Sequence, residues 1–282
     1  MKKKVLIVLI AFLLIGCGPR FVYYQLDWLI PLILRDYISL NAEQKRLLKD
    51  RVVRRIDWHC RTQLGSYSTT LRTLSRDISN LDHPMEYQRM SEYYTKFYGY
   101  WTELIRQVSP DLAELLKTAT DDQIEELFNN LNERGEEMRA EYVDLPEGEL
   151  IKQREDRMIK AIRKWLSDPT PEQKQAVAMW SQQLKSLGSE WMQYRDRIEE
   201  EVRYLLRKRR DLPDFEQRFT DVLVHPERMR SESYQIKNDY NTDLTIKLAL
   251  KINHLMTPEQ RKRLTKRIDS LAEDFEKIKC EG

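Results

Sequence analysis

The residues best suited to chemistry are a histidine and a cysteine that adjoin, His59 and Cys60, directly after Trp58. A zinc site of this kind takes four ligands, commonly Cys and His at short spacings. The other histidines, His83, His225 and His254, are scattered, with no Cys or His neighbour. A cysteine nucleophile also needs a separate histidine that activates it. The pattern therefore favours a packed helix end, and we expect neither a metal nor a cofactor.

Serines and paired acids are the remaining catalytic candidates. A hydrolase serine sits on a strained Gly-x-Ser-x-Gly turn, whereas Gly65-Ser66 stands alone. The acidic runs Asp121-Asp122 and Glu199-Glu200-Glu201 fall on expected polar helix faces, where solvated charge is the ordinary explanation. We therefore expect no catalytic residues, and predict that the protein is not an enzyme.

Cys17 suggests a covalent modification instead. Three lysines at residues 2–4 precede an apolar run from Val5 to Ile15, which is the layout of an export signal and is shorter than the roughly 20 residues that cross a bilayer. Leu14 and Gly16 before Cys17 resemble the lipobox of bacterial lipoproteins. The resemblance implies that a signal peptide, residues 1–16, is removed and that Cys17 carries acyl chains such as palmitate, which anchor the protein to a membrane.

The residue after the lipobox bears on location. Gly18 stands where an aspartate would be the familiar signal for retention in the inner membrane. The resemblance therefore implies an outer-membrane lipoprotein whose body faces the periplasm, with the inner membrane as the alternative. Such a compartment permits disulfides, so Cys60 and Cys280 form either a disulfide or two buried free thiols. A bridge would close a very long loop and contribute about 4–5 kcal/mol in the entropic description.

Composition excludes some classes of partner. Loss of residues 1–16 removes three lysines and no acid, so the formal charge falls from +2 to −1. With charged residues making up 33% of the chain, this balance indicates a solvated surface and not a nucleic-acid protein, which would need a basic surplus. Only 8 glycines and 10 prolines occur, a composition typical of helices.

A five-residue phrase recurs before apolar-periodic stretches: Leu40-Asn41-Ala42-Glu43-Gln44, Ala119-Thr120-Asp121-Asp122-Gln123, Pro169-Thr170-Pro171-Glu172-Gln173 and Met256-Thr257-Pro258-Glu259-Gln260. Asn or Thr can cap a helix, Pro suits the first helical position, and Gln three residues after the cap can reach back to it. Each phrase therefore predicts a helix start, and three of them follow another helix, which makes helical hairpins. The unequal spacing of the glutamines argues against a regular solenoid.

The same periodicity predicts an all-α fold, an irregular array of amphipathic hairpins with breaks at prolines including Pro84, Pro110, Pro146, Pro213 and Pro226. Apolar residues three and four apart suggest one long helix over 171–209. We expect a lipidated N-terminus and apolar anchor-proximal helix at 17–40 and a helical body at 41–282, with a division into two lobes near 144–148 as an option. Further helices are expected at 21–37, 42–62, 65–79, 85–108, 110–118, 147–167, 214–224 and 227–254.

Two family resemblances rest on these residues. The repeated phrase is similar to the Leu-Thr-x-x-Gln signature of Spy-like periplasmic chaperones, all-helical proteins that hold unfolded clients without ATP; only its polar half recurs in all four copies. The segments at 24–31, 36–40 and 58–64, which include Trp28, Asp36 and Trp58, resemble an uncharacterised family of Gram-negative lipoproteins. That resemblance implies a lipoprotein and no specific activity.

Two groups of side chains are candidates for a binding surface. Tyr94, Phe97, Tyr98 and Trp101 share a predicted core face, whereas Tyr93 and Tyr100 fall off it and either fill a space between helices, which is favoured, or line a surface that binds a protein segment or a glycan. Arg207, Lys208, Arg209 and Arg210 follow an expected helix end, where cations complement the helix dipole; the alternative is contact with anionic lipid or peptidoglycan.

The sequence thus predicts a lipid-anchored periplasmic helical protein that binds other envelope proteins, as an assembly factor or in a chaperone-like role. Its expected partners are the membrane, through the N-terminal lipid, and an envelope protein. The alternative is an envelope scaffold that contacts peptidoglycan or the membrane surface, followed by an envelope enzyme.

Overall fold

The computed structural model describes residues 19–280, and Cys17 with the expected signal peptide lies outside the described residues. Within 19–280 the chain forms twelve α-helices, one short 3-10 helix and no strand, which confirms the all-α fold class. The elements are α2 (Pro19–Tyr23), α3 (Leu26–Leu34), α4 (Ala42–Thr62), α5 (Leu64–Ser79), α6 (Tyr87–Lys117), α7 (Asp121–Tyr142), α8 (Glu147–Trp165), α9 (Pro171–Gln183), α10 (Gly188–Arg207), α11 (Phe215–Val224), η1 (Pro226–Met229), α12 (Glu232–His254) and α13 (Pro258–Glu276).

Four helices, α4, α7, α9 and α13, start at the repeated phrase, as predicted. In each, the N-cap side chain accepts a hydrogen bond from the backbone N–H of the glutamine, and the glutamine side chain accepts one from the N-cap backbone N–H. These capping boxes satisfy two backbone donors that the start of a helix would otherwise leave free. The N-caps are Asn41, Thr120, Thr170 and Thr257.

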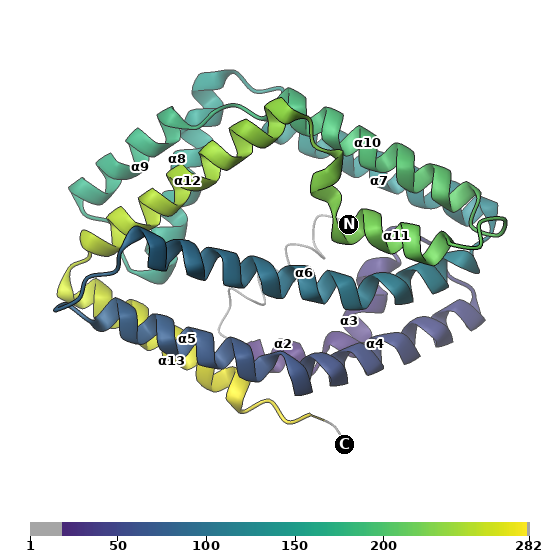
Figure 1. The fold of residues 1–282 in the computed structure, drawn as a ribbon, viewed down its shortest axis with the longest axis horizontal. Helices are drawn as coiled ribbons and strands as arrows, with labels where there is room; N and C mark the ends of the chain where they lie inside the picture. Colours follow the sequence, from purple (N-terminus) through teal and green to yellow (C-terminus); the bar gives the residue numbers. More distant parts are fainter. Residues whose placement is uncertain (1–18, 281–282) are drawn as a thin grey trace.

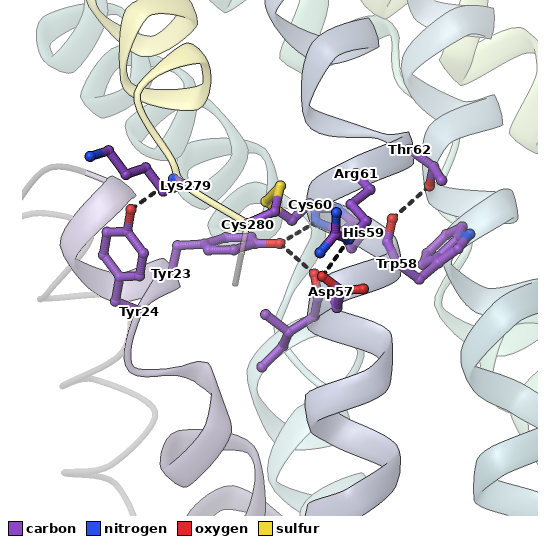
Figure 2. Close-up of a disulfide and its surroundings, with 11 residues drawn as sticks. Tyr23, Tyr24, Asp57, Trp58, His59, Cys60, Arg61, Thr62, Lys279 and Cys280 are labelled. Carbon is purple, nitrogen blue, oxygen red and sulfur yellow. Dashed lines mark hydrogen bonds and ion pairs between the residues drawn. A yellow bond between two sulfur atoms is a disulfide. The ribbon is translucent and has the colours of Figure 1, made fainter. Parts of the chain in front are cut away.

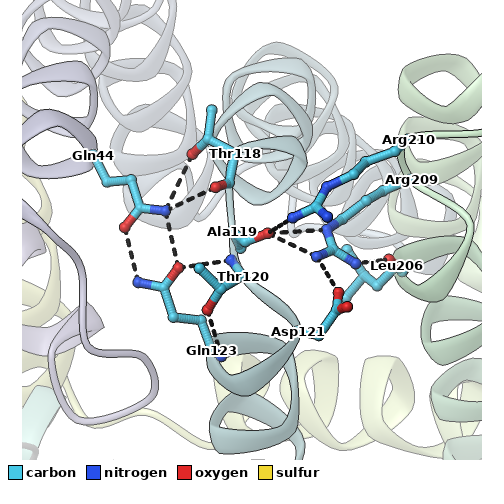
Figure 3. Close-up of polar contacts among 9 residues, drawn as sticks. All are labelled: Gln44, Thr118, Ala119, Thr120, Asp121, Gln123, Leu206, Arg209 and Arg210. Carbon is cyan, nitrogen blue, oxygen red and sulfur yellow. Dashed lines mark hydrogen bonds and ion pairs between the residues drawn. The ribbon is translucent and has the colours of Figure 1, made fainter.

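The four capping glutamines also meet in two pairs. The amides of Gln44 and Gln123 each donate to the side-chain oxygen of the other, at 3.0 and 2.8 Å (Figure 3). Gln173 and Gln260 do the same at 2.8 and 3.1 Å. Every one of these amides donates to a main-chain carbonyl of the opposite hairpin as well, at Thr118, Ser39, Leu255 and Asp168. The phrase therefore joins two helical hairpins in addition to starting a helix.

The helices are arranged as a flattened ring (Figure 1). Helices α4 and α5 follow one edge, with α13 packed beside α5, and α6 runs along the inner side of that edge. Helices α7 and α10 form a second side, and α8, α9 and α12 form a third. Each glutamine pair lies at one of the two opposite corners where these sides meet.

A hydrophobic core fills each corner. One contains Leu71, Ile162, Val177, Ile252 and Ile268, from α5, α8, α9, α12 and α13. The other contains side chains of α6, α7, α10 and α11 such as Leu116, Phe128, Leu205 and Phe219. Both cores draw residues from both sides of 144–148, the segment at which the sequence suggested a division into lobes. Helix α6 links the corners, because its start lies in the first core and its end in the second.

The single helix expected over 171–209 is wrong, because α9 ends at Gln183 and α10 begins at Gly188. The cause lies on another helix. The Asn241 side chain of α12 accepts a hydrogen bond from the Lys185 N–H and donates to the Lys185 carbonyl, both at 2.8 Å. These two bonds replace main-chain partners that a continuous helix would supply.

The break expected at Pro110 is also wrong, since α6 continues through that residue. A proline inside a helix costs about 3 kcal/mol, because it removes one hydrogen bond and crowds the preceding turn. Burial offsets this cost, since Ala113, Leu115 and Leu116 just beyond it are almost fully buried. The two segments predicted at 85–108 and 110–118 are thus one helix.

Candidate functional site

The aromatic residues of α6 are divided between two faces, and the face that was expected to be buried is the exposed one. Tyr93 is 6% exposed and belongs to a core, so it is not part of a free binding surface. In contrast, the four residues expected in the core have exposed fractions between 39% and 59%. We call these four side chains, Tyr94, Phe97, Tyr98 and Trp101, the aromatic face.

Tyr93 and Tyr100 instead attach α6 to α5. The Tyr93 hydroxyl donates to the Asp77 carboxylate at 2.6 Å, and burial together with this contact raises its pKa. The Tyr100 hydroxyl donates to the Ser66 carbonyl at 3.0 Å and lies 2.7 Å from the Thr70 hydroxyl. Of the two alternatives for Tyr93 and Tyr100, the binding surface is therefore wrong: both side chains fill the space between helices.

The aromatic face continues the side of α6 that meets α12. Tyr87, Tyr94, Tyr98 and Trp101 are three, four or seven residues apart and so share one side of the helix. The Tyr87 hydroxyl donates to the Asp243 carboxylate of α12 at 2.6 Å. Beyond this contact the two helices diverge, and α11 packs against the far end of α6 (Figure 1). The aromatic face thus borders the space between α6 and α12.

Helix α12 presents apolar side chains toward the same space. Ile236 and Tyr240 are exposed, and they lie seven and three residues before Asp243, on the side of α12 that reaches α6. Tyr94 and Tyr98 stack with their ring centroids 6.4 Å apart. Exposed apolar clusters of this kind are typical of interaction sites, and tyrosine offers apolar area with a polar tip. The arrangement is suited to binding a polypeptide segment.

The basic run after α10 has two different roles. Arg209 is 2% exposed, and its guanidinium donates to the carbonyls of Ala119 and Leu206 and to the Asp121 carboxylate, the last at 2.6 Å (Figure 3). Arg210 donates to the Ala119 carbonyl as well, at 3.1 Å. The prediction that Arg209 belongs to a binding surface is therefore wrong, because this side chain is buried and holds the turn between α6 and α7 through its hydrogen bonds.

Arg207 and Lys208 remain exposed. The Arg207 guanidinium lies 3.6 Å from the Glu125 carboxylate, an exposed pair that contributes at most about 1 kcal/mol. Of the four cations in the run, these two lack the main-chain contacts that Arg209 and Arg210 make, so they are the ones free to meet a partner.

Cys60 and Cys280 form a disulfide, with Cα atoms 5.6 Å apart and a separation of 220 positions in the chain (Figure 2). The helix α2 is fastened beside it. The Tyr23 hydroxyl donates to the Ile56 carbonyl and lies 3.1 Å from His59 Nδ1, and the Tyr24 hydroxyl accepts from the Lys279 N–H at 2.9 Å. Both ends of the described chain therefore meet at the end of α4.

His59 has structural partners. Because the single Tyr23 hydroxyl proton goes to Ile56, Nδ1 of His59 carries the proton shared with Tyr23, and Nε2 accepts from the Tyr67 hydroxyl at 3.2 Å. Burial lowers the pKa of His59, which favours this neutral form. Across residues 19–280, no group of three or more His, Cys, Asp or Glu is placed to hold a metal ion.

Sequence reasoning missed Ile236, Tyr240 and Asp243, because nothing in the local pattern of α12 shows which helix lies opposite.

No helix in the described part of the chain is both long and apolar enough to cross a membrane.

Comparison with known proteins places the chain in a family. It shows no significant similarity to a curated protein or to a solved structure. A family model matches residues 36–235, which is more than half of the chain and includes three of the four capping glutamines together with the aromatic face. The chain belongs to DUF6279, a family of unknown function.

Proposed function

We propose that this protein is a lipid-anchored envelope protein that binds segments of other envelope proteins, as an assembly factor or a chaperone-like holder. The observation that carries the proposal is the aromatic face on α6, with Ile236 and Tyr240 across from it on α12. A segment lying between the two helices would bury apolar area on both sides. At about 25 cal/mol per Å² of apolar surface, such burial is the main source of affinity.

The chemistry of the face suits varied partners. Tyrosine and tryptophan combine a large rigid apolar area with a polar edge, and they lose few rotamers on binding. They can therefore contact unrelated apolar segments without a fixed pattern of hydrogen bonds. This property suits a holder of unfolded or partly assembled clients better than it suits a site for one small molecule.

The location in the proposal rests on the lipobox at Leu14, Gly16 and Cys17, which favours the outer membrane and a body that faces the periplasm. The repeated capping phrase adds a likeness to Spy-like chaperones. In this chain the polar residues of the phrase are engaged in caps and glutamine pairs, so the likeness supports a shared way of building hairpins. The aromatic face supports the activity.

The proposal is tested with the chain from Pro19 onward, which contains every contact described above. We expect it to suppress the aggregation of an unfolded model client and to co-purify with envelope proteins. The variant Tyr94→Ser/Tyr98→Ser/Trp101→Ser should lose both activities while keeping its helical content. A matched control, Trp165→Ser/Met179→Ser, removes exposed apolar side chains from α8 and α9 and should keep them.

Two results count against this function. The idea should be dropped if the unmodified chain neither suppresses aggregation nor retains any envelope protein. If the control variant loses as much activity as the aromatic-face variant, general stickiness and not a defined site explains the binding.

A scaffold that contacts the membrane surface or peptidoglycan is the second candidate. The observation in its favour is that Phe21, Trp28 and Ile30, close to the expected anchor, are exposed. Aromatic and aliphatic side chains in such a position can enter the interfacial layer of a bilayer. Binding to vesicles or to isolated cell-wall sacculi at low salt, lost in Phe21→Ser/Trp28→Ser, would favour this function, and absence of binding would exclude it.

A further inference from the structure

A cavity of about 370 Å³ lies where the turn between α7 and α8 meets the break between α9 and α10. Its apolar wall belongs to neither corner core, so it is a separate site between them. The volume lies within the range of small-molecule sites, roughly 300–1,000 Å³. The apolar side chains that line it are Met138, Val143, Leu150, Leu184, Leu187 and Trp191.

The cavity exists because α9 and α10 are not continuous. The Asn241 side chain holds the break open through its two hydrogen bonds to the Lys185 backbone, and Asn241 itself lines the cavity. At the start of α10, Gly188 lies so close to the α7–α8 turn that a Cβ atom there would be 3.1 Å from a methyl group of Val143. Two elements far apart in the sequence are thus brought together to shape the site.

The cavity has one sign of charge. Arg154, Arg157 and Lys185 line it, and no carboxylate does. Over the whole chain the charges are almost balanced, with 48 Lys and Arg against 46 Asp and Glu. Three lining cations, of which only Arg154 is paired with an acid, Glu147, are therefore a local departure from the composition, and they create a positive field over an apolar wall.

Two of the three cations lack a carboxylate partner. The Arg157 guanidinium lies over the Tyr142 ring, 4.8 Å from its centre, and donates to the Gln153 side chain at 2.9 Å. The Lys185 ammonium lies 5.4 Å from the centre of the Tyr240 ring. Neither forms an ion pair within the described part of the chain. Only Arg154 is paired, with the Glu147 carboxylate at 3.3 Å.

A second cavity, of about 600 Å³ beside α11, shows the contrast. Its lining contains acids and bases together, and Arg218 is already paired with the Glu201 carboxylate at 3.2 Å. Asp221 is likewise paired, with the Arg228 guanidinium. Because these charges are already paired, the second cavity has no net attraction for an anionic or a cationic ligand, and we propose no ligand for it.

We propose that the cavity between the α7–α8 turn and the α9–α10 break binds a single-chain amphiphile with an anionic head, an alkyl chain that ends in a carboxylate or a phosphate. The chain lies against the apolar wall, where it leaves water. The head accepts hydrogen bonds from Arg157 and Lys185 at the rim. Charge-assisted bonds of this kind are about twice as strong as neutral ones.

The test uses the chain from Pro19 onward and four probes: dodecanoate and dodecyl phosphate below their micelle concentrations, dodecanol below its solubility limit, and acetate. Calorimetric titration should show binding of the two long anions, much weaker binding of dodecanol, and none of acetate. The variant Arg157→Gln/Lys185→Gln should weaken binding of the long anions by about a hundredfold, since each of the two charged hydrogen bonds contributes about a factor of ten. The matched control Lys160→Gln/Lys164→Gln removes two exposed cations of α8 outside the lining and should bind as the unmodified chain does.

The proposal is overturned if neither long anion binds, if dodecanol binds as tightly as dodecanoate, or if the Arg157→Gln/Lys185→Gln variant binds like its control. Tighter binding of dodecanoate points to a free fatty acid as the source of the ligand, and tighter binding of dodecyl phosphate to a phosphate monoester derived from lipid. Because none of the residues that line the cavity belongs to the aromatic face, loss of client binding in the aromatic-face variant should leave the titration unchanged. Failure of one proposal is therefore distinct from failure of the other.

Discussion

Replacing Gln173 by alanine should lower the free energy of unfolding much more than a substitution at an exposed position, because this side chain holds together the corner where α9 and α13 begin. The Gln173 side chain is fully buried. Its oxygen accepts from the Thr170 N–H and from the Gln260 amide, and its nitrogen donates to the Leu255 carbonyl and to the Gln260 oxygen. Gln173→Ala removes all four hydrogen bonds, so the Thr170 N–H and the Leu255 carbonyl lose the partner that Gln173 supplies, and the Gln260 side chain keeps only its bonds to Asp168 and Thr257.

The magnitude follows from the groups left behind. An unsatisfied buried polar group costs about 1–3 kcal/mol, and three residues lose a partner here, Thr170, Leu255 and Gln260. We therefore expect the free energy of unfolding to fall by about 3–5 kcal/mol. At about 2–4 °C per kcal/mol for a chain of this size, Tm should fall by roughly 10 °C. Gln183→Ala, at an exposed position of the same helix, should change stability by about 0.5 kcal/mol or less.

Urea unfolding followed by circular dichroism measures the loss, and a double-variant cycle identifies its source. Once Gln173 is gone, the two hydrogen bonds between the paired amides are already lost, so Gln173→Ala/Gln260→Ala should cost less than the sum of the two single changes by about 1 kcal/mol or more. Equal effects of Gln173→Ala and Gln183→Ala, or strict additivity in the cycle, would refute the view that the paired amides hold the corner together.

Three further results are expected. Cys60→Ser/Cys280→Ser should lower the free energy of unfolding by about 4–5 kcal/mol. Addition of a reductant should likewise lower the unfolding midpoint of the unmodified chain, and an unchanged midpoint would contradict this. Because the pKa of His59 is lower in the folded chain than its ordinary value of about 6.5, the unfolded chain binds more protons between the two values, so stability should be complete above pH 6.5 and fall as the pH drops below it. Unfolding at pH 7.5 and 5.5 measures this, and His59→Gln should remove the difference. Arg209→Ala should cost about 3 kcal/mol or more in thermal unfolding, because it removes the charged hydrogen bonds of a buried guanidinium to the Ala119 and Leu206 carbonyls and the Asp121 carboxylate, whereas Arg207→Ala should cost about 0.5 kcal/mol or less.

Helix starts were predictable from the sequence because their causes are local. Thr257 and Gln260, for example, are three residues apart and satisfy each other's backbone wherever the helix lies. The all-α fold class follows from the same short-range patterns. The pairing of the four glutamines was not predictable, because it joins positions such as Gln44 and Gln123 that no periodicity relates.

The faces of α6 show a different limit. Aromatic side chains lie on both sides of this helix, so hydrophobic periodicity cannot tell the buried face from the exposed one. Tyr93 is buried because Asp77 on α5 accepts its hydroxyl, and Tyr98 is exposed because no helix covers it. The break at Lys185 has a similar origin, since it depends on Asn241 in α12. In each case a residue distant in sequence decides between two outcomes that local preferences leave open.

The disulfide also governs how the molecule bears a mechanical load. Helix α2 packs against α13, and Tyr24 is hydrogen-bonded to Lys279 beside the Cys60–Cys280 bond. Tension applied at Pro19 therefore enters a cross-linked junction of α2, α4 and the end of the described chain. A force that reaches Cys60 along the chain passes through the covalent bond to Cys280, so the segment between these two cysteines, with helices α5 to α13, is shielded from it. Helices α2, α3 and α4 lie before the bond and resist the same force only through their packing and hydrogen bonds.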